Sequence, residues 1–178
     1  MTTDFRLESM EPLDYQRQTR KASIIIIIIF AASAMLLSSL LVMIFGSNEA
    51  SNFKWNLTGV LLGLFLTIIL ISSHLRHQPW MDASNYGWRL KRNLMKVTNI
   101  MHNVKAGVAN DDPVAIKTLR FYHLGLLQMQ RLDGNPDQDS DLVNEINQLQ
   151  EKMQQLGIEP QQEQLNSQWL QQLKSSSK

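Results

Sequence analysis

Two long runs without a charged residue divide the chain into apolar and polar regions. The first covers residues 22–45 and includes six consecutive isoleucines, and the second covers residues 55–73. At about 1.5 Å per helical residue these runs reach about 36 Å and about 28 Å, against a hydrocarbon core about 30 Å thick. Lipid offers no partner to an unpaired backbone group, so a helix is favoured even for a run of β-branched isoleucines. The pattern predicts two transmembrane helices, over residues 22–45 and 55–75.

After Pro79 the apolar positions repeat alternately four and three residues apart. This spacing places the residues of each repeat on one face of a helix. The three stripes are Leu90, Leu94, Val97, Met101 and Val104; Ala115, Leu119, Tyr122, Leu126 and Met129; and Leu142, Ile146, Leu149, Met153 and Leu156. Asp112 followed by Pro113 predicts the start of the second helix. A parallel coiled-coil dimer would show the same spacing, but the short connections favour an antiparallel three-helix bundle over residues 80–158.

Positive charges flank the two apolar runs unequally. Three cations directly precede the first run, the segment between the runs holds only Lys54, and four cations follow the second run within twenty residues. They are Arg17, Arg20 and Lys21 before the first run, and Arg76, Arg89, Lys91 and Arg92 after the second. Cytoplasmic loops carry an excess of Lys and Arg, so both termini are predicted to be cytoplasmic. The first run is too long for the apolar region of a cleaved signal peptide.

The polar segments outside these helices are expected to be ends and connections. Residues 1–21 form a cytoplasmic N-terminal segment, residues 46–54 a loop outside the cytoplasm, and residues 159–178 a flexible tail rich in glutamine and serine. The apolar edge of the tail either docks on the bundle or the membrane interface, or is a partner-binding peptide. That edge consists of Leu165, Trp169, Leu170 and Leu173. The predicted fold class is all-α: a two-helix transmembrane hairpin followed by a small cytoplasmic antiparallel three-helix bundle.

Small residues recur at helical spacing within both apolar runs. Gly59, Gly63 and Thr67 follow one another at intervals of four in the second run, and Ala34 and Ser38 do so in the first. Small side chains let two helix backbones approach closely, which drives helix association in lipid. We expect these five residues to pack the two spans of one hairpin against each other, with homodimerisation through the two glycines as the alternative.

Charge is also sorted along the polar region. Residues 74–105 carry a net charge of +5, whereas residues 106–178 carry −4. The acidic distal part argues against nucleic acid as a partner. A basic segment beside a membrane span suits an anionic leaflet. We therefore assign five residues to the membrane interface, two of them tryptophans that flank the second run and three of them cations on roughly one helical face: Trp55, Trp80, Arg89, Arg92 and Lys96.

Residue types that carry out catalysis or bind metals are sparse. The chain has no cysteine, which excludes disulfides, thiol catalysis and cysteine-based zinc sites. His74 and His77 could supply two metal ligands from one helix, but no third ligand lies at a useful spacing. His102 and His123 lie beside the apolar stripes and are interpreted as solvated or hydrogen-bonded. We expect no catalytic residue, no cofactor, no metal site and no small-molecule substrate, and hence no enzyme.

Three segments resemble a known family. They are residues 56–63 (NLTGVLLG), 77–81 (HQPWM) and 121–126 (FYHLGL). In combination they resemble the uncharacterised two-span inner-membrane proteins of gammaproteobacteria, which are grouped only as a domain of unknown function. The resemblance covers roughly residues 10–158 and leaves the tail outside. It implies a location in the bacterial inner membrane, with residues 46–54 as a periplasmic loop, and brings no activity or catalytic residues.

Together these patterns favour a membrane-anchored, non-enzymatic interaction or scaffold protein. The hairpin would tether the helical bundle, which would bind another protein or a second copy of the chain. The alternative is an accessory subunit of a larger inner-membrane complex, which would bind through its transmembrane helices at Gly59 and Gly63. A sensor of the lipid surface that uses the three interface cations is a third hypothesis. The expected partners are therefore the lipid bilayer and either a homo-oligomer or a protein of a membrane complex.

Overall fold

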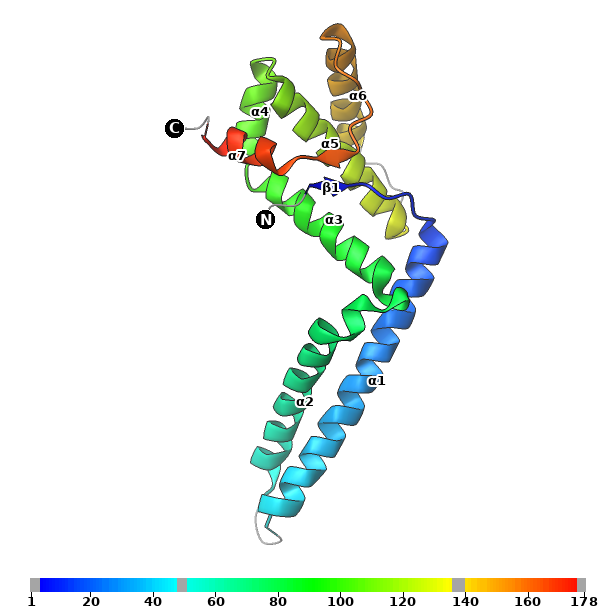
Figure 1. The fold of residues 1–178 in the computed structure, drawn as a ribbon, viewed down its shortest axis with the longest axis vertical. Helices are drawn as coiled ribbons and strands as arrows, with labels where there is room; N and C mark the ends of the chain where they lie inside the picture. The colour runs from blue at the N-terminus through cyan, green and yellow to red at the C-terminus, as the bar shows by residue number, and fades with distance from the viewer. Residues whose placement is uncertain (1–3, 48–50, 136–139, 176–178) are drawn as a thin grey trace. The chain divides into compact units, whose positions relative to one another are not determined.

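The computed structural model describes residues 4–47, 51–135 and 140–175 (Figure 1). Within these ranges the chain forms seven α-helices, two short 3-10 helices and two strands of two residues each. The fold is therefore all-α, as the hydrophobic pattern predicts. The middle of the predicted loop 46–54 and the extreme ends of the chain lie outside the described residues.

The chain folds as two compact units. Tyr15–Asn85 forms the first, which we call the hairpin unit. Met1–Asp14 together with Tyr86–Lys178 forms the second, which we call the helical unit. The start of the chain thus packs with its C-terminal half, although the sequence pattern indicated a separate N-terminal segment over residues 1–21.

Helices α1 (Pro12–Phe45) and α2 (Phe53–Ser73) provide most of the hairpin unit. Helix α1 begins ten residues before the apolar run, because residues 12–21 contain no residue that breaks a helix after the proline at its first position. Both helices are long and apolar enough to cross a membrane. Only 6% of the most apolar part of α1 and 17% of that of α2 are buried within the protein, so their apolar surface faces outward. The 3-10 helices Leu75–His77 and Pro79–Met81 follow α2.

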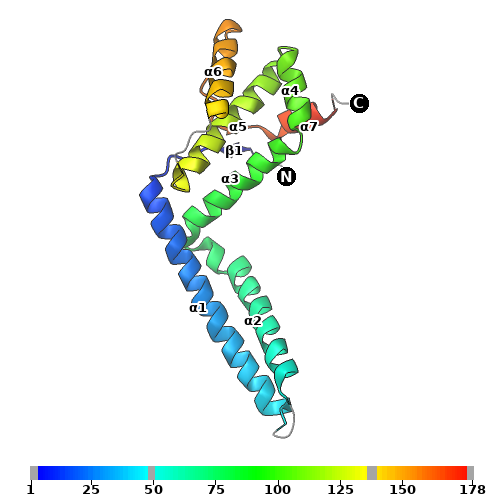
Figure 2. The same cartoon turned by 180° about the vertical axis from the view of Figure 1, so that it is seen from behind.

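The helical unit is organised around its longest helix. Its elements are α3 (Asp82–Thr98) from Tyr86 onward, α4 (Met101–Ala109), α5 (Pro113–Leu132), α6 (Ser140–Gln155) and α7 (Ser167–Ser175), with strands β1 (Phe5–Arg6) and β2 (Gln164–Leu165). Helix α5 contacts α4, α6, α7 and β2, and Figure 2 shows it from the opposite side. The core comprises large side chains that are almost completely buried, including Tyr86, Leu90, Val97, Ile116, Phe121, Met153 and Leu173.

This arrangement differs from the predicted antiparallel three-helix bundle, because the first stripe does not lie on one helix. Helix α3 ends at Thr98 and α4 begins at Met101. The Thr98 hydroxyl donates to the carbonyl oxygen of Leu94 at 3.1 Å, and the Ile100 amide donates three residues back to Val97 at 3.0 Å. Thr98 and Asn99 are weak helix formers. The bond from Ile100 to Val97 spans three residues instead of four and therefore closes a tighter turn that ends the helix. A spacing of four and three residues does not reveal this break.

The tail also differs from the flexible segment that its composition predicts. Strand β2 pairs antiparallel with β1, so that Phe5 lies opposite Leu165. The Phe5 ring stacks on Tyr86 with centroids 6.1 Å apart and meets the edge of Phe121 at 6.2 Å. The Asp4 carboxylate accepts a hydrogen bond of 3.1 Å from the Ser167 amide at the start of α7. The first residues of the chain, together with α4 and α5, therefore hold residues 164–175 in place.

Candidate functional site

The five predicted packing residues lie along α1 and α2 of the hairpin unit. A Cβ atom added to Gly59 would lie 2.3 Å from the Cα of Ser38, and one added to Gly63 would lie 2.7 Å from the Cα of Ala34. Thr67, one turn further along α2, is buried and donates to the carbonyl oxygen of Gly63 at 2.7 Å. At both glycines the space for a side chain is filled by the backbone of α1. The two helices thus meet at small residues, as in close helix pairs in lipid.

Polar and aromatic contacts join the two helices near the connecting loop. The Ser38 hydroxyl donates to Oδ1 of Asn56 at 2.8 Å. The ring of Trp55 stacks on Phe45 with centroids 5.0 Å apart, and the Lys54 ammonium lies 5.2 Å from the same ring. Trp55, predicted to mark the membrane interface, therefore lies at the loop end of α2.

The remaining predicted interface residues follow α2 in the chain. Trp80 is half-buried in the 3-10 helix Pro79–Met81. Arg89 pairs with Glu8 at 2.9 Å, Arg92 lies over the ring of Trp88 at 5.0 Å, and Lys96 donates to Asn93 at 2.9 Å. The structure places these three cations on the exposed side of α3.

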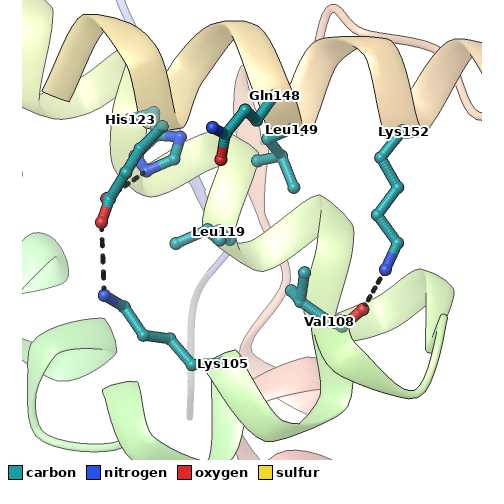
Figure 3. A pocket seen from close by; sticks show the side chains of 8 residues that line it. Lys105, Val108, Leu119, His123, Gln148, Leu149 and Lys152 are labelled. Carbon is teal, nitrogen blue, oxygen red and sulfur yellow. Dashed lines mark hydrogen bonds and ion pairs between the residues drawn. The ribbon is translucent and has the colours of Figure 1, made fainter. Parts of the chain in front are cut away.

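A cleft of about 280 Å³ opens between α4, α5 and α6 of the helical unit (Figure 3). Leu119 and Leu149 lie between Lys105 on one side and Lys152 on the other. Its lining consists of Lys105, Val108, Leu119, His123, Glu145, Gln148, Leu149 and Lys152. A second hollow of about 350 Å³ shares Lys105, Leu119, His123 and Glu145 with it. The cleft thus has an apolar floor and a polar rim.

The charged groups at the rim are already paired across the cleft. Lys105 of α4 lies 3.4 Å from Glu145 of α6, and Lys152 of α6 lies 2.7 Å from Asp111. Lys152 also donates to the carbonyl oxygen of Val108. The Lys105 and Glu145 side chains are more than half exposed, so the pair is screened and contributes at most about 1 kcal/mol. A partner that entered the cleft could exchange the Lys105–Glu145 pair at low cost.

His123 is the buried polar group of this cleft. The side chain is 1% exposed, and its Nδ1 has no hydrogen-bond partner in the described part of the chain. Burial lowers the pKa of His123 to about 4; the carboxylate of Glu145 opposes this effect, whereas Arg120 and Lys105 add to it. The imidazole is therefore neutral at pH 7, and its Nε2, 3.8 Å from Glu145, makes no ion pair there. The sequence pattern indicated a solvated or hydrogen-bonded histidine and missed this burial.

Arg120 links α5 to the turn after α6. It is 8% exposed, and its Nε donates to the carbonyl oxygen of Pro160 at 2.8 Å. Burial lowers the pKa of Arg120 from its ordinary value, although a guanidinium remains charged at any physiological pH. One guanidinium nitrogen has no partner among the residues that the structure covers. Arg120 therefore positions the segment at Pro160 that leads into β2.

The histidine pair after α2 shows no metal geometry. The Arg76 Nε donates to Nε2 of His77 at 3.0 Å, which occupies one possible ligand atom. In residues 4–47, 51–135 and 140–175, no three His, Cys, Asp or Glu side chains come together as a metal site would require.

Sequence reasoning did not find the cleft. In the sequence, Lys105, Glu145 and Lys152 contribute only to the charge balance, and no local signal distinguishes them from solvated surface residues. Leu119 and Leu149 were assigned to apolar stripes, and they form its floor. The spacing of Lys105 and His123 on separate helices gives no indication that both face Glu145.

Comparison with known proteins identifies one match. A family model described as "Protein of unknown function (DUF3087)" matches residues 5–170. No curated protein and no solved structure matches the chain. The matched range extends beyond the segment of roughly residues 10–158 over which the chain resembles its relatives by motif, and it includes β1, β2 and the start of α7.

Proposed function

The chain belongs to this family of proteins of unknown function, so we propose a role from its sequence and geometry alone. We propose that it is a membrane-anchored, non-enzymatic interaction protein. The hairpin unit holds the protein in the bacterial inner membrane with both termini in the cytoplasm. The helical unit presents the cleft between α4, α5 and α6 to another protein or to a second copy of the chain.

The surface of the hairpin unit supports the anchoring role. Large apolar side chains point outward along both helices: Ile27, Ile28, Met35 and Leu36 of α1 and Leu61, Phe65 and Ile68 of α2 are each at least half exposed. Exposing such a surface to water would be costly, at about 25 cal/mol per Å². Lipid removes that cost, and the cation distribution supports a cytoplasmic location for both termini.

The observation that carries the proposed interaction is the cleft itself. It combines an apolar floor at Leu119 and Leu149 with charges of both signs at Lys105, Glu145 and Lys152. Apolar centres surrounded by a polar rim are typical of protein interfaces. Exchange of rim ion pairs offers specificity, and burial of the floor offers affinity.

The contact between α1 and α2 favours this proposal over an accessory subunit that binds through its transmembrane helices. Gly59 and Gly63 already face Ser38 and Ala34 within the hairpin unit. A partner helix would have to displace α1 to use the same glycines. The same geometry argues against homodimerisation through these residues.

Site-specific photocrosslinking tests the proposal. A benzoylphenylalanine replaces Gln148, which lines the cleft, and in a matched variant it replaces Gln154, which is exposed on the opposite side of α6. We expect one defined protein adduct, or a dimer of this chain, from Gln148 in native membranes and none from Gln154. The double variant Leu119→Glu with Leu149→Glu should abolish it.

The adduct must then be reproduced with the purified partner and the full chain in nanodiscs. Failure to reproduce it, or equal adducts from both positions, would contradict binding at the cleft. A dimer adduct would identify the second copy as the occupant.

A further inference from the structure

Helix α3 carries an exposed row of mixed apolar and basic side chains. Residues three and four apart lie on one face of a helix, so Trp88, Arg92 and Met95 form a row, and Lys96 lies beside Arg92. The opposite face, with Leu90, Leu94 and Val97, is buried. We call Trp88, Arg92, Met95 and Lys96 the outer strip.

The two apolar members of the outer strip are unusually exposed. Trp88 is 61% exposed and Met95 is 64% exposed. The Arg92 guanidinium lies 5.0 Å from the centre of the Trp88 ring, which places a cation directly beside the aromatic group. Tryptophan and basic side chains together favour the headgroup region of a bilayer, where a ring can be half-immersed and a cation can meet phosphate.

The charges around the outer strip distinguish it from its flanks. At the flanks, Arg89 pairs with Glu8 at 2.9 Å and Lys91 pairs with Asp133 at 3.5 Å. In the outer strip, neither Arg92 nor Lys96 pairs with a carboxylate among the residues that the structure describes. Glu8 and Asp133, the carboxylates that pair with cations of α3 in the described residues, thus lie at the flanks of the strip. Two cations remain available on the face that also exposes Trp88 and Met95.

We propose that the outer strip binds the anionic headgroups of the bilayer that anchors the hairpin unit. Trp88 and Met95 lie among the headgroups, and Arg92 and Lys96 bind lipid phosphates. Charge complementarity selects an anionic surface, because each cation near such a surface contributes about 1 kcal/mol. The chain also brings the strip within reach: Trp88 follows the end of α2 at Ser73 by fifteen residues, which span at most about 50 Å.

The inference rests on the proposed anchoring and adds a second, reversible contact to it. Binding of the outer strip would fix the helical unit at the surface in a lipid-dependent way. It uses none of the cleft residues, so lipid would bind at α3 and a protein partner between α4, α5 and α6.

The absence of cysteine from the chain permits a direct test with the full-length protein. A single cysteine replaces Asn99, which is exposed one turn beyond Met95, and carries an environment-sensitive dye. The protein is reconstituted into vesicles of phosphatidylcholine alone or of phosphatidylcholine with phosphatidylglycerol. A second labelled variant, Gln171→Cys in α7, reports on an exposed position away from the strip.

We expect a blue shift of the dye at position 99 only in vesicles that contain phosphatidylglycerol, and no shift at position 171. Arg92→Gln with Lys96→Gln should lower the docking constant roughly 30-fold, which abolishes most of the shift. The control Arg131→Gln with Lys174→Gln removes the same charge from exposed positions elsewhere and should leave the shift unchanged. High salt should reduce the shift of the unsubstituted strip.

Each other outcome overturns the inference. Insertion of the protein is measured by flotation of the vesicles on a density gradient. If the protein floats with both kinds of vesicle but the emission of the dye at position 99 does not shift, the hairpin unit inserts and the strip stays in water. An equal shift in both vesicles, lost on dilution of the protein, would assign the strip to a contact between two copies. Failure to float with either vesicle would contradict the anchoring itself, and with it this contact.

Discussion

The two units of the protein bury opposite kinds of side chain. In the hairpin unit, Gly59, Gly63 and Ala34 are buried and the large apolar residues face outward. In the helical unit, Phe121 and Ile116 are completely buried. Water drives large apolar groups into a core, whereas lipid does not, so helices in lipid associate where their backbones come closest. The two units thus show the two patterns of burial that these different effects would produce, and each can be tested separately.

Two phenylalanines give the largest contrast between the units. Phe121→Ala removes a ring that is 0% exposed in the helical unit, and we expect a loss of about 3–5 kcal/mol in the free energy of unfolding of that unit. Phe65→Ala removes a ring that is 63% exposed on α2 and should leave that free energy unchanged. Urea unfolding of the full chain in nanodiscs, followed by near-ultraviolet circular dichroism, measures both. Equal losses would contradict the division into two units.

The buried histidine sharpens the comparison, because it makes the helical unit sensitive to pH. The pKa of His123 is about 4 in the folded protein and about 6.5 in the unfolded chain. Between these values the unfolded state binds the proton first, so stability falls as the pH falls from about 6.5 to about 4, by up to about 3 kcal/mol. The plot of urea midpoint against pH should be flatter for His123→Gln than for the parent protein. Its slope should be unchanged for the exposed control His102→Gln. An unaltered slope for His123→Gln would show that this imidazole is not buried in the folded state.

A bulky residue at the glycine step should disturb the hairpin unit alone. Gly63→Ile adds a branched side chain at a position where even a Cβ atom would lie 2.7 Å from the Cα of Ala34. Overpacking of this kind costs about 1–3 kcal/mol. The yield of a disulfide between cysteines at positions 38 and 56 reports on the contact, because Ser38 and Asn56 are hydrogen-bonded at 2.8 Å. Leu62→Ile on the exposed side is the matched control. An undiminished yield in Gly63→Ile would mean that α1 and α2 do not meet at this glycine.

The smallest expected effect concerns the contact between the two ends of the chain. Asp4 accepts a hydrogen bond from the first amide of α7, and Asp4→Ala should lower the protection of α7 amides from hydrogen exchange by about 1 kcal/mol. Glu163→Gln removes only an exposed ion pair with Arg6 and should change protection by less than about 0.5 kcal/mol. If α7 exchanged equally in the parent and in Asp4→Ala, the carboxylate would not hold the helix.

Local patterns were sufficient for some elements of the fold. The two apolar runs gave both long helices, and Asp112 before Pro113 marked the start of α5, where its carboxylate accepts a hydrogen bond from the Val114 amide at 2.9 Å. These signals depend on residues that are neighbours in the sequence. Membership of an uncharacterised family was likewise indicated by short motifs and is confirmed by the family match.

Features that depend on distant contacts could not be predicted in this way. Phe5 lies in a segment of mixed polarity, and nothing near it indicates that it would pair with Leu165 and enter the core beside Tyr86. The apolar edge of the tail indicated docking on the bundle as one of two interpretations, and Leu165 and Leu173 are buried in the helical unit, but its glutamine content gave no sign of the helix α7 or of the pairing with β1. The pairing of Lys105 with Glu145 also depends on how α6 packs, which the apolar stripe alone does not determine.

The most direct test of the account is the topology of the hairpin unit. Single cysteines at Ser47, beside the loop, and at Ser175, in α7, are exposed positions for a membrane-impermeant maleimide. In spheroplasts we predict labelling of Ser47→Cys from outside, and labelling of Ser175→Cys only after lysis. Labelling of both positions from the same side would show that α1 and α2 do not cross the membrane. Labelling of Ser175→Cys from outside with Ser47→Cys protected would place the helical unit in the periplasm and contradict the proposed cytoplasmic role.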